Sequence, residues 1–270
     1  MNPLLIKDIF IQICHVFEIV TLIKLEEVSK WHKEIIRCQK WSDLSIRLKN
    51  DNDVMLVLDT HHFYNLDLQS SDVTDSSVSK LINIHTLNLR NTMITHRSIS
   101  KLRNVHTLDL SYTRTNNKCV KKLINVHTLN LSRTKVTNVS KLTNVHSLNL
   151  SYTHVTDESI SKLTNVSVLD LSCTNVTDES VSKLANVRSL NLSITCGVTD
   201  QSISKLTNLR TLSVNFTNKI TKCGISTLSR LERLYFYYSR ISNKDIENLG
   251  FLKIYEDGKA CRDCMDNYGV

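Results

Sequence analysis

The 270-residue sequence contains little glycine and almost no proline, with 5 and 1 residues respectively. This scarcity argues against collagen-like chains, proline-rich linkers and sheet sandwiches built on tight turns. Apolar residues make up 41% of the chain and charged residues 22%, so the chain can bury a real core and is not a disordered charged tail. The net charge of +8 permits contacts with nucleic acid or membranes without requiring either.

Long hydrophobic runs are also absent. The leucine- and isoleucine-rich start of the chain is interrupted by Lys7, Asp8 and Glu18. Its longest uncharged run, residues 9–17, is far shorter than the ~20 residues that cross a bilayer. The order of charged and apolar residues also differs from that of a secretory signal. We therefore expect a soluble intracellular chain with no membrane partner, located in the cytoplasm or nucleus (of the host cell, if the gene is viral).

The sequence lacks the motifs of common enzymes: it has no phosphate-binding loop, no G-x-S-x-G and no H-E-x-x-H. Its 8 cysteines are scattered, and only Cys261 and Cys264 are close in sequence. A structural zinc site needs four ligands, so this pair alone does not predict one. Scattered free thiols are typical of a cytosolic protein. We expect no catalytic residues, no metal and no cofactor.

What the sequence does contain is a repeat. A Leu-x-Leu step or a close variant recurs at spacings of 19 to 22 residues, beginning at Leu66, Leu87, Leu108, Leu129, Leu148, Leu169, Leu190, Leu212 and Leu234. Alternation of apolar and polar residues predicts a short strand in each unit. Apolar residues three apart, such as Ile160, Leu163 and Val166, predict one or two helical turns. One unit cannot bury its core alone, so the units are expected to stack into a solenoid.

Two polar positions in each unit have predicted local roles. Asp157, and likewise Asp178 and Asp200, stands where a helix N-cap would accept backbone N–H bonds. The asparagine before each strand, for example Asn144, is expected to adopt the left-handed conformation that ends a helical turn. The shortest unit, which ends at Leu148, is expected to lack part of its helical segment.

This pattern resembles the leucine-rich repeat family. The family's L-x-x-L-x-L-x-x-N/C-x-L signature appears with threonine at the polar ladder position: Thr92, Thr113, Thr134, Thr153 and Thr174. The resemblance implies an α/β fold, a horseshoe-shaped solenoid with a parallel sheet on its concave face, over nine units in residues 64–252. The threonine hydroxyls are expected to bond neighbouring loop backbone. Residues 46–63 are expected to form a linker and N-terminal cap with an irregular strand near 54–58, and residues 253–270 a polar tail.

Residues 1–45 do not share the repeat, and their apolar residues have helical spacing. Pro3, the step Asp8-Ile9-Phe10, the runs 22–25 and 28–31, and the closing Trp41 resemble an F-box. Leu5 stands where that family usually has an acidic residue. The resemblance implies a small helical domain that binds the Skp-type linker of an SCF-type cullin-RING ubiquitin ligase, while the repeats select the protein to be ubiquitinated.

By position in the F-box pattern, eight residues are candidates for the linker contact: Pro3, Ile6, Ile9, Phe10, Leu22, Leu25, Val28 and Trp31. The alternative for each is a place in the inner core of a three-helix cap. In that case the protein would be a free-standing leucine-rich repeat scaffold whose N-terminal helices only cap the solenoid.

Along each strand, the leucines are expected to point inward and the alternate residues outward. Most outward residues are small and polar, whereas aromatic and arginine side chains supply most of the energy of interfaces. The target-binding candidates therefore lie at strand ends or in the loops just after them: Arg90, Tyr112, Arg133, Tyr152, Tyr235, Tyr237 and Arg240. The alternative for each is an ordinary surface residue.

Two further columns recur with the repeat. Lysines such as Lys162 and Lys205 stand beside the inward leucine of the helical segment, which indicates a solvated face. Because interleaved aromatics and recognition motifs are lacking, no nucleic-acid partner is expected. Histidines precede four strands at the same offset: His85, His106, His127 and His146. Such a column could bind metal or respond to pH, but repeat copying also explains it, since serine and arginine fill the position later.

Overall fold

The computed structural model describes residues 30–31, 34–35, 40–60, 62–246 and 253–254. The chain forms two compact units, Met1–Arg114 (unit 1) and Thr115–Val270 (unit 2), and each is described by itself. Of the eight predicted linker contacts, only Trp31 is among the described residues. It lies at a helical position, and 42% of its surface is exposed. The other seven, with most of the F-box-like segment and the tail, lie outside the described residues.

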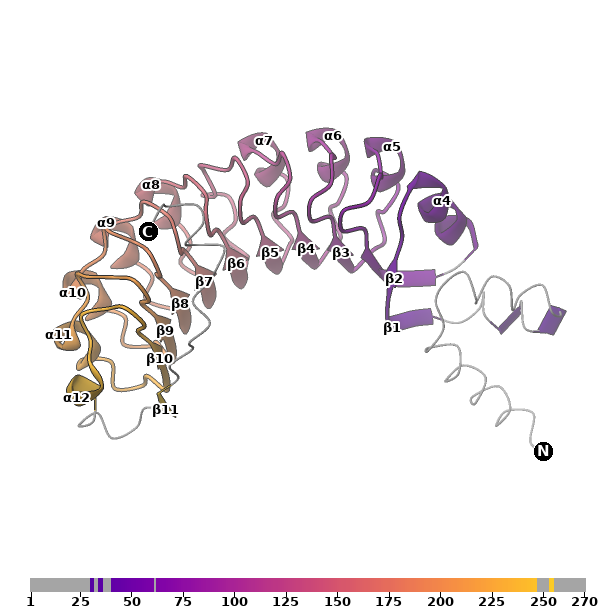
Figure 1. The fold of residues 1–270 in the computed structure, drawn as a ribbon. Coiled ribbons are helices and arrows are strands. Elements are labelled where there is room, and N and C mark those ends of the chain that lie inside the picture. The colour runs from indigo at the N-terminus through magenta and orange to yellow at the C-terminus, as the bar shows by residue number, and fades with distance from the viewer. Residues whose placement is uncertain (1–29, 32–33, 36–39, 61, 247–252, 255–270) are drawn as a thin grey trace, which may run out of the picture. The chain divides into compact units, whose positions relative to one another are not determined.

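Unit 1 contains a parallel sheet in which each strand pairs with the next along the chain (Figure 1). Its elements are β1 (Lys40–Arg47), α4 (Asp51–Thr60), β2 (His62–Asp67), α5 (Asp75–Val78), β3 (Thr86–Asn88), α6 (His96–Ile99) and β4 (Thr107–Asp109). The irregular strand expected near 54–58 is wrong: these residues belong to the helix α4, with Val54 and Val57 buried. The strand that precedes the first repeat is β1 instead.

Unit 2 repeats the same strand–turn–helix order. Its elements are α7 (Asn117–Val120), β5 (Thr128–Asn130), β6 (Ser147–Asn149), α8 (Asp157–Ile160), β7 (Val168–Asp170), α9 (Asp178–Val181), β8 (Ser189–Asn191), α10 (Asp200–Ile203), β9 (Thr211–Ser213), α11 (Lys222–Ile225), β10 (Arg233–Tyr235), α12 (Asn243–Ile246) and β11 (Lys253–Ile254). Strands β5 to β11 pair in sequence order, all parallel. Residues 131–146, all of which are described, contain no helix, so the shortest unit loses its whole helical segment rather than the expected part of it.

The nine predicted strands are confirmed as β2 to β10, and their central leucines form the core. Within each unit these leucines face one another in the strand register, for example Leu148 opposite Leu169 and Leu169 opposite Leu190. None of the nine is more than 2% exposed. The flanking strand residues are half-buried or exposed, so the sheet has one buried and one open face. A one-residue slip would turn every leucine to the open face, which fixes the register.

The short helices begin at a threonine or asparagine rather than at the predicted aspartate. Thr177, for example, is the N-cap of α9, and its side chain accepts a hydrogen bond from Glu179 N. The aspartate that follows acts between repeats. Asp157 accepts hydrogen bonds from Thr177 N (2.9 Å), Thr177 Oγ1 (2.7 Å) and Ser180 Oγ (2.5 Å). The N-cap prediction for the aspartates is therefore wrong by one position, and the carboxylates join neighbouring repeats.

The asparagines before the strands do not take the left-handed conformation. None of the described ones, such as Asn165 and Asn186, has a positive φ. Their amide nitrogens instead donate to a carbonyl of the preceding repeat: Asn165 Nδ2 to Thr143 O at 3.0 Å and Asn186 Nδ2 to Thr164 O at 2.8 Å. They therefore hold the helical sides of adjacent repeats together.

Candidate protein-binding surface

The turn after each strand carries the candidate surface. Its middle residue has a positive φ of 48° to 60° in nine repeats: Ser70, Asn91, Tyr112, Arg133, Tyr152, Cys173, Ile194, Phe216 and Tyr238. We call these nine residues, with the residue before each, the strand-end ridge. The backbone N–H of the middle residue extends the ladder to the next repeat, as from Tyr152 N to Ser172 O at 3.1 Å. The backbone of the ridge therefore continues the hydrogen-bond ladder of the strands.

The residue after each positive φ closes the turn. Thr153 Oγ1 donates to Leu150 O at 2.6 Å, and Thr174 Oγ1 donates to Leu171 O at the same distance. These threonine hydroxyls therefore bond the carbonyl three residues earlier in their own repeat, not the neighbouring loop that the family resemblance implied. The left-handed conformation of the middle residue, with its positive φ, costs ~1–2 kcal/mol for a residue other than glycine. Side chains are nevertheless present at this position in every repeat, which marks it as a place where side chains are presented.

In unit 1, two predicted target-binding residues contact each other. The Arg90 guanidinium lies over the Tyr112 ring, 4.3 Å from its centroid. Arg90 NH1 also donates to Ser111 Oγ at 3.4 Å, so the side chain reaches the ridge of the next repeat. Tyr112 is 39% exposed. A cation–π contact of this exposure contributes ~0.5–1 kcal/mol and fixes the orientation of both side chains.

Unit 2 contains the same contact between two other candidates. The Arg133 guanidinium lies 3.9 Å from the centroid of the Tyr152 ring. Both residues occupy the positive-φ position, in neighbouring repeats. The strand-end ridge thus presents arginine and tyrosine side chains in fixed pairs within each unit.

The largest aromatic group of the ridge lies at the turn after β10. Tyr237 and Tyr238 meet edge to face with ring centroids 4.4 Å apart, and Phe216 of the previous repeat stacks on Tyr238 at 5.4 Å. The hydrogen bond with Tyr238 raises the pKa of Tyr237 above its ordinary value. Tyr238 is 70% exposed. We call Phe216, Tyr237 and Tyr238 the aromatic cluster.

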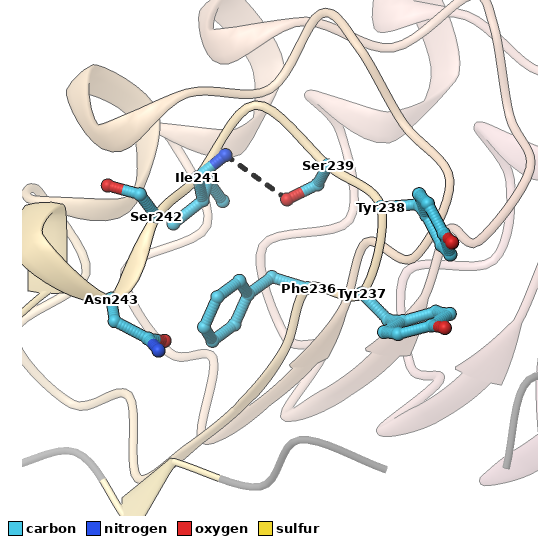
Figure 2. Close-up of a pocket in the computed structure, with 7 residues that line it drawn as sticks. All are labelled: Phe236, Tyr237, Tyr238, Ser239, Ile241, Ser242 and Asn243. Atoms are coloured by element: carbon cyan, nitrogen blue, oxygen red, sulfur yellow. Dashed lines mark hydrogen bonds between the residues drawn. The ribbon is translucent and has the colours of Figure 1, made fainter. Parts of the chain in front are cut away.

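Figure 2 shows how this turn separates its rings. Phe236 points into the repeat beside Asn243, whereas Tyr237 and Tyr238 lie side by side on the other side of the chain. Ser239 Oγ accepts a hydrogen bond from Ile241 N at 3.1 Å, which closes the loop behind the tyrosines. The hollow lined by residues 236–239 and 241–243 has a volume of about 240 Å³, below the ~300–1,000 Å³ of small-molecule sites. The turn therefore presents a surface rather than a ligand cavity.

Comparison with known proteins agrees with this architecture. A family model described as a leucine-rich repeat matches residues 141–164 and 162–185. The match covers two successive repeats. The repeat region has the leucine-rich-repeat fold. No curated protein sequence matches the chain.

Three solved structures illustrate the likeness. A leucine-rich repeat protein of Leptospira interrogans is 23% identical with a TM-score of 0.59, over 84% of this chain and 69% of that one. An internalin (inlF) of Listeria monocytogenes is 18% identical with a TM-score of 0.58, over 71% of this chain and 66% of that one. The plant peptide hormone receptor RGFR1, in complex with RGF2, is 16% identical with a TM-score of 0.53 over 81% of this chain. This chain spans 39% of that receptor's length and about two thirds of the internalin's.

On the leucine-rich repeats, the structure groups most of the sequence candidates. Arg90 pairs with Tyr112, and Arg133 pairs with Tyr152. Tyr237 joins the aromatic cluster, and Tyr235 lies half-buried on β10 two residues before it. Arg240 is exposed in the loop before α12 and contacts no other candidate among the described residues. Their role in binding a target stays a prediction.

Two residues of the cluster were not among the sequence candidates. Phe216 and Tyr238 occupy the same repeat position as Tyr112 and Tyr152, so an alignment of the repeats at this turn would have found them. Within the described part of the chain, no group of three His, Cys, Asp or Glu side chains is placed to hold a metal ion. None of the described helices is long and apolar enough to span a bilayer.

Proposed function

We propose that this chain is a non-catalytic adaptor whose leucine-rich repeats bind a protein partner through the strand-end ridge. The aromatic cluster is the observation that carries the proposal, because Tyr238 is 70% exposed at its centre. Tyrosines offer large contact area at low conformational-entropy cost and a hydroxyl for hydrogen bonds, and they are enriched at the energetic centres of interfaces.

The preorganisation of the ridge supports the same proposal. Arg90 and Arg133 already stack on tyrosines, so little side-chain freedom is lost when a partner covers them. The plant receptor with this fold was solved in complex with RGF2, which is consistent with recognition of a polypeptide by stacked repeats. The partner of this chain would contact the open, strand-bearing side of the repeats.

We further propose that the adaptor is the substrate-recognition subunit of an SCF-type cullin-RING ubiquitin ligase. The support is the resemblance of the N-terminal segment to an F-box, carried by Asp8-Ile9-Phe10, Trp31 and Trp41. A Skp-type linker would then bind the candidates named above, and the ridge would hold the protein to be ubiquitinated. Such an adaptor works in the cytoplasm or nucleus, where thiols such as those of Cys196 and Cys223 remain reduced.

The ridge proposal is tested by capturing partners from a cell extract, identifying them by mass spectrometry and titrating one purified partner calorimetrically. Tyr238→Ala should weaken binding by about 2 kcal/mol, about thirtyfold in Kd. Ile124→Ala is the matched control, because Ile124 is 49% exposed but lies outside the ridge. Equal affinities of the wild type and Tyr238→Ala, with both proteins folded by circular dichroism, would refute the ridge as the binding surface.

The ubiquitin-ligase proposal has its own test. The full chain should retain a purified Skp-type linker, and Ile9→Glu together with Leu22→Glu should abolish retention while the repeats stay folded. Failure of the wild-type chain to retain the linker removes this proposal and leaves the scaffold. A deletion of residues 1–39 separates the alternatives further, because it spares β1 (Lys40–Arg47). Unfolding of unit 1 after this deletion would favour a capping role for the N-terminal segment.

A further inference from the structure

A polar groove in unit 2 lies at the start of the strands, away from the strand-end ridge. It has a volume of about 370 Å³ and is lined by two columns: His146, Ser167, Arg188 and Arg210, and Asn165, Asn186, Asn208 and Arg230. Each member of the first column directly precedes a strand, β6 to β9. Each repeat therefore adds one residue to the first column and one to the second.

Backbone hydrogen bonds set the spacing of the first column. Ser167 N donates to His146 O at 2.9 Å, and Arg188 N donates to Ser167 O at 2.8 Å. Arg210 N then donates to Arg188 O at 2.8 Å. Neighbouring parallel strands lie ~4.8 Å apart, so the column from His146 to Arg210 spans roughly 14 Å. The stacked rings of His127 and His146, 4.8 Å apart, have the same spacing.

Hydrogen bonds to neighbouring repeats restrain the side chains of the second column. The amide nitrogens of Asn165, Asn186 and Asn208 donate to carbonyls of the preceding repeat, the last to Ala185 O at 2.9 Å. Asn208 Oδ1 accepts a hydrogen bond from Arg230 NH1 at 3.0 Å, which fixes the guanidinium at the end of the column. Hydrogen bonds thus restrain the four side chains of the second column.

The groove carries a surplus of positive charge. None of its eight lining residues is acidic. Arg210 is neutralised from outside by Glu232, at 2.8 Å. Arg188 is exposed and has no hydrogen-bond or ionic partner for its guanidinium among the described residues. Arginine presents its N–H donors in a planar fork that matches the two oxygens of a carboxylate. Arg188 and Arg230 are therefore the two groove residues suited to bind acidic side chains.

We infer that this groove binds an acidic, extended segment of the protein partner. The inference rests on the proposed function and gives the repeats a second contact, remote from the aromatic cluster. The length favours a peptide over a small anion: roughly 14 Å accommodates four or five residues at ~3.3 Å each, whereas a single anion would reach only part of the column. The lining has no phenylalanine, tyrosine or tryptophan side chain on which nucleic-acid bases could stack.

Fluorescence anisotropy with the full chain tests this inference. The probe is a labelled octapeptide of alternating glutamate and serine, and a second octapeptide replaces each glutamate with glutamine. The wild type should bind the first probe at least about tenfold more tightly than the second. Arg188→Glu with Arg230→Glu should weaken binding of the acidic probe at least about tenfold. Lys162→Glu with Lys205→Glu makes the same change in net charge at exposed lysines outside the groove and should leave binding within about twofold.

Three results would overturn the inference. One is equal binding of the acidic and glutamine probes by the wild type, or no binding of either. Another is equal weakening by the lysine and arginine variants, which would indicate a general charge effect. The third is tighter binding of a labelled single-stranded oligonucleotide that the arginine variant abolishes, which would assign the groove to nucleic acid. The partner titration with Tyr238→Ala uses none of these probes, so failure of the groove inference can be told apart from failure of the ridge proposal.

Discussion

The aspartate bridges between repeats give the sharpest prediction. Replacing Asp157 with alanine removes the acceptor of three hydrogen bonds from the next repeat, donated by Thr177 N, Thr177 Oγ1 and Ser180 Oγ. A hydrogen bond contributes ~1 kcal/mol net, and partial exposure of the carboxylate reduces this value. We therefore expect Asp157→Ala to lower the free energy of unfolding by about 2 kcal/mol.

Asparagine should be tolerated better, because one repeat of this chain already uses it. Asn117 takes the equivalent place, and its Oδ1 accepts from Thr137 N at 2.9 Å while its Nδ2 donates to Thr137 Oγ1 at 2.8 Å. Asp157→Asn should keep this arrangement and lose only the charge-assisted part, so we expect a loss of about 1 kcal/mol or less.

The two variants also differ in their dependence on pH. Burial raises the pKa of Asp157, but hydrogen bonds from Ser180 and Thr177 and the charge of Lys183 outweigh it and hold the pKa below its ordinary 3.8. A carboxyl group with a lowered pKa stabilises the fold above its unfolded pKa, and this contribution is lost as the pH falls through the folded pKa. The stability advantage of the wild type over Asp157→Asn should therefore shrink below pH ~4.

Urea unfolding followed by circular dichroism at pH 7 and at pH ~3 measures both effects. Glu158→Gln is the matched control, because it removes one charge from the adjacent exposed carboxylate. The reasoning is refuted if the difference between wild type and Asp157→Asn is the same at both pH values. It is equally refuted if Glu158→Gln reproduces the loss seen with Asp157→Ala at pH 7.

Three further predictions concern packing and backbone geometry in unit 2, each measured as a shift in the urea midpoint. Leu190→Ala should cost ~2–5 kcal/mol, because the side chain is 2% exposed in the leucine column; a loss below 1 kcal/mol would contradict the assigned core. Gly197→Ala should cost ~2 kcal/mol, because a Cβ would lie 2.5 Å from Val176 O, and an unchanged midpoint would contradict this close approach. Ile194→Gly should raise stability by up to ~1 kcal/mol, because Ile194 has a φ of 60°; a lower midpoint would show that its side chain stabilises the turn more than the backbone strain costs.

The core leucines and the register of the strands that carry them could be predicted from the sequence. Leu148, Leu169 and Leu190 recur at a spacing of 21 residues, and their burial depends only on the alternation along each strand. The exposed lysines beside the helical leucines, such as Lys162, also follow from this pattern. Strand β1 and helix α4 could not be predicted in the same way, because they stand before the repeat and share none of its period.

The local roles of polar residues were harder to predict, for a physical reason. Threonine, aspartate and asparagine each have several backbone groups within reach, and stacking decides which one is bonded. Asp157 therefore bonds the next repeat rather than capping its own helix, and Asn186 bonds the previous repeat rather than ending a turn. Of the candidate surface, the residue types were predicted, and Phe216 and Tyr238 could have been found too, since each follows its strand leucine by four positions, as Tyr112 and Tyr152 do.

By itself, the sequence determined the period, the strands and the leucine core, since these depend on which face of a short segment is apolar. The tertiary structure decided which side chains meet across repeats: Arg90 with Tyr112, Asp157 with Thr177, and Arg210 with Glu232. These partners are 20 to 22 residues apart in the chain. They become neighbours only because parallel strands stack ~4.8 Å apart, which turns a repeat in sequence into columns in space.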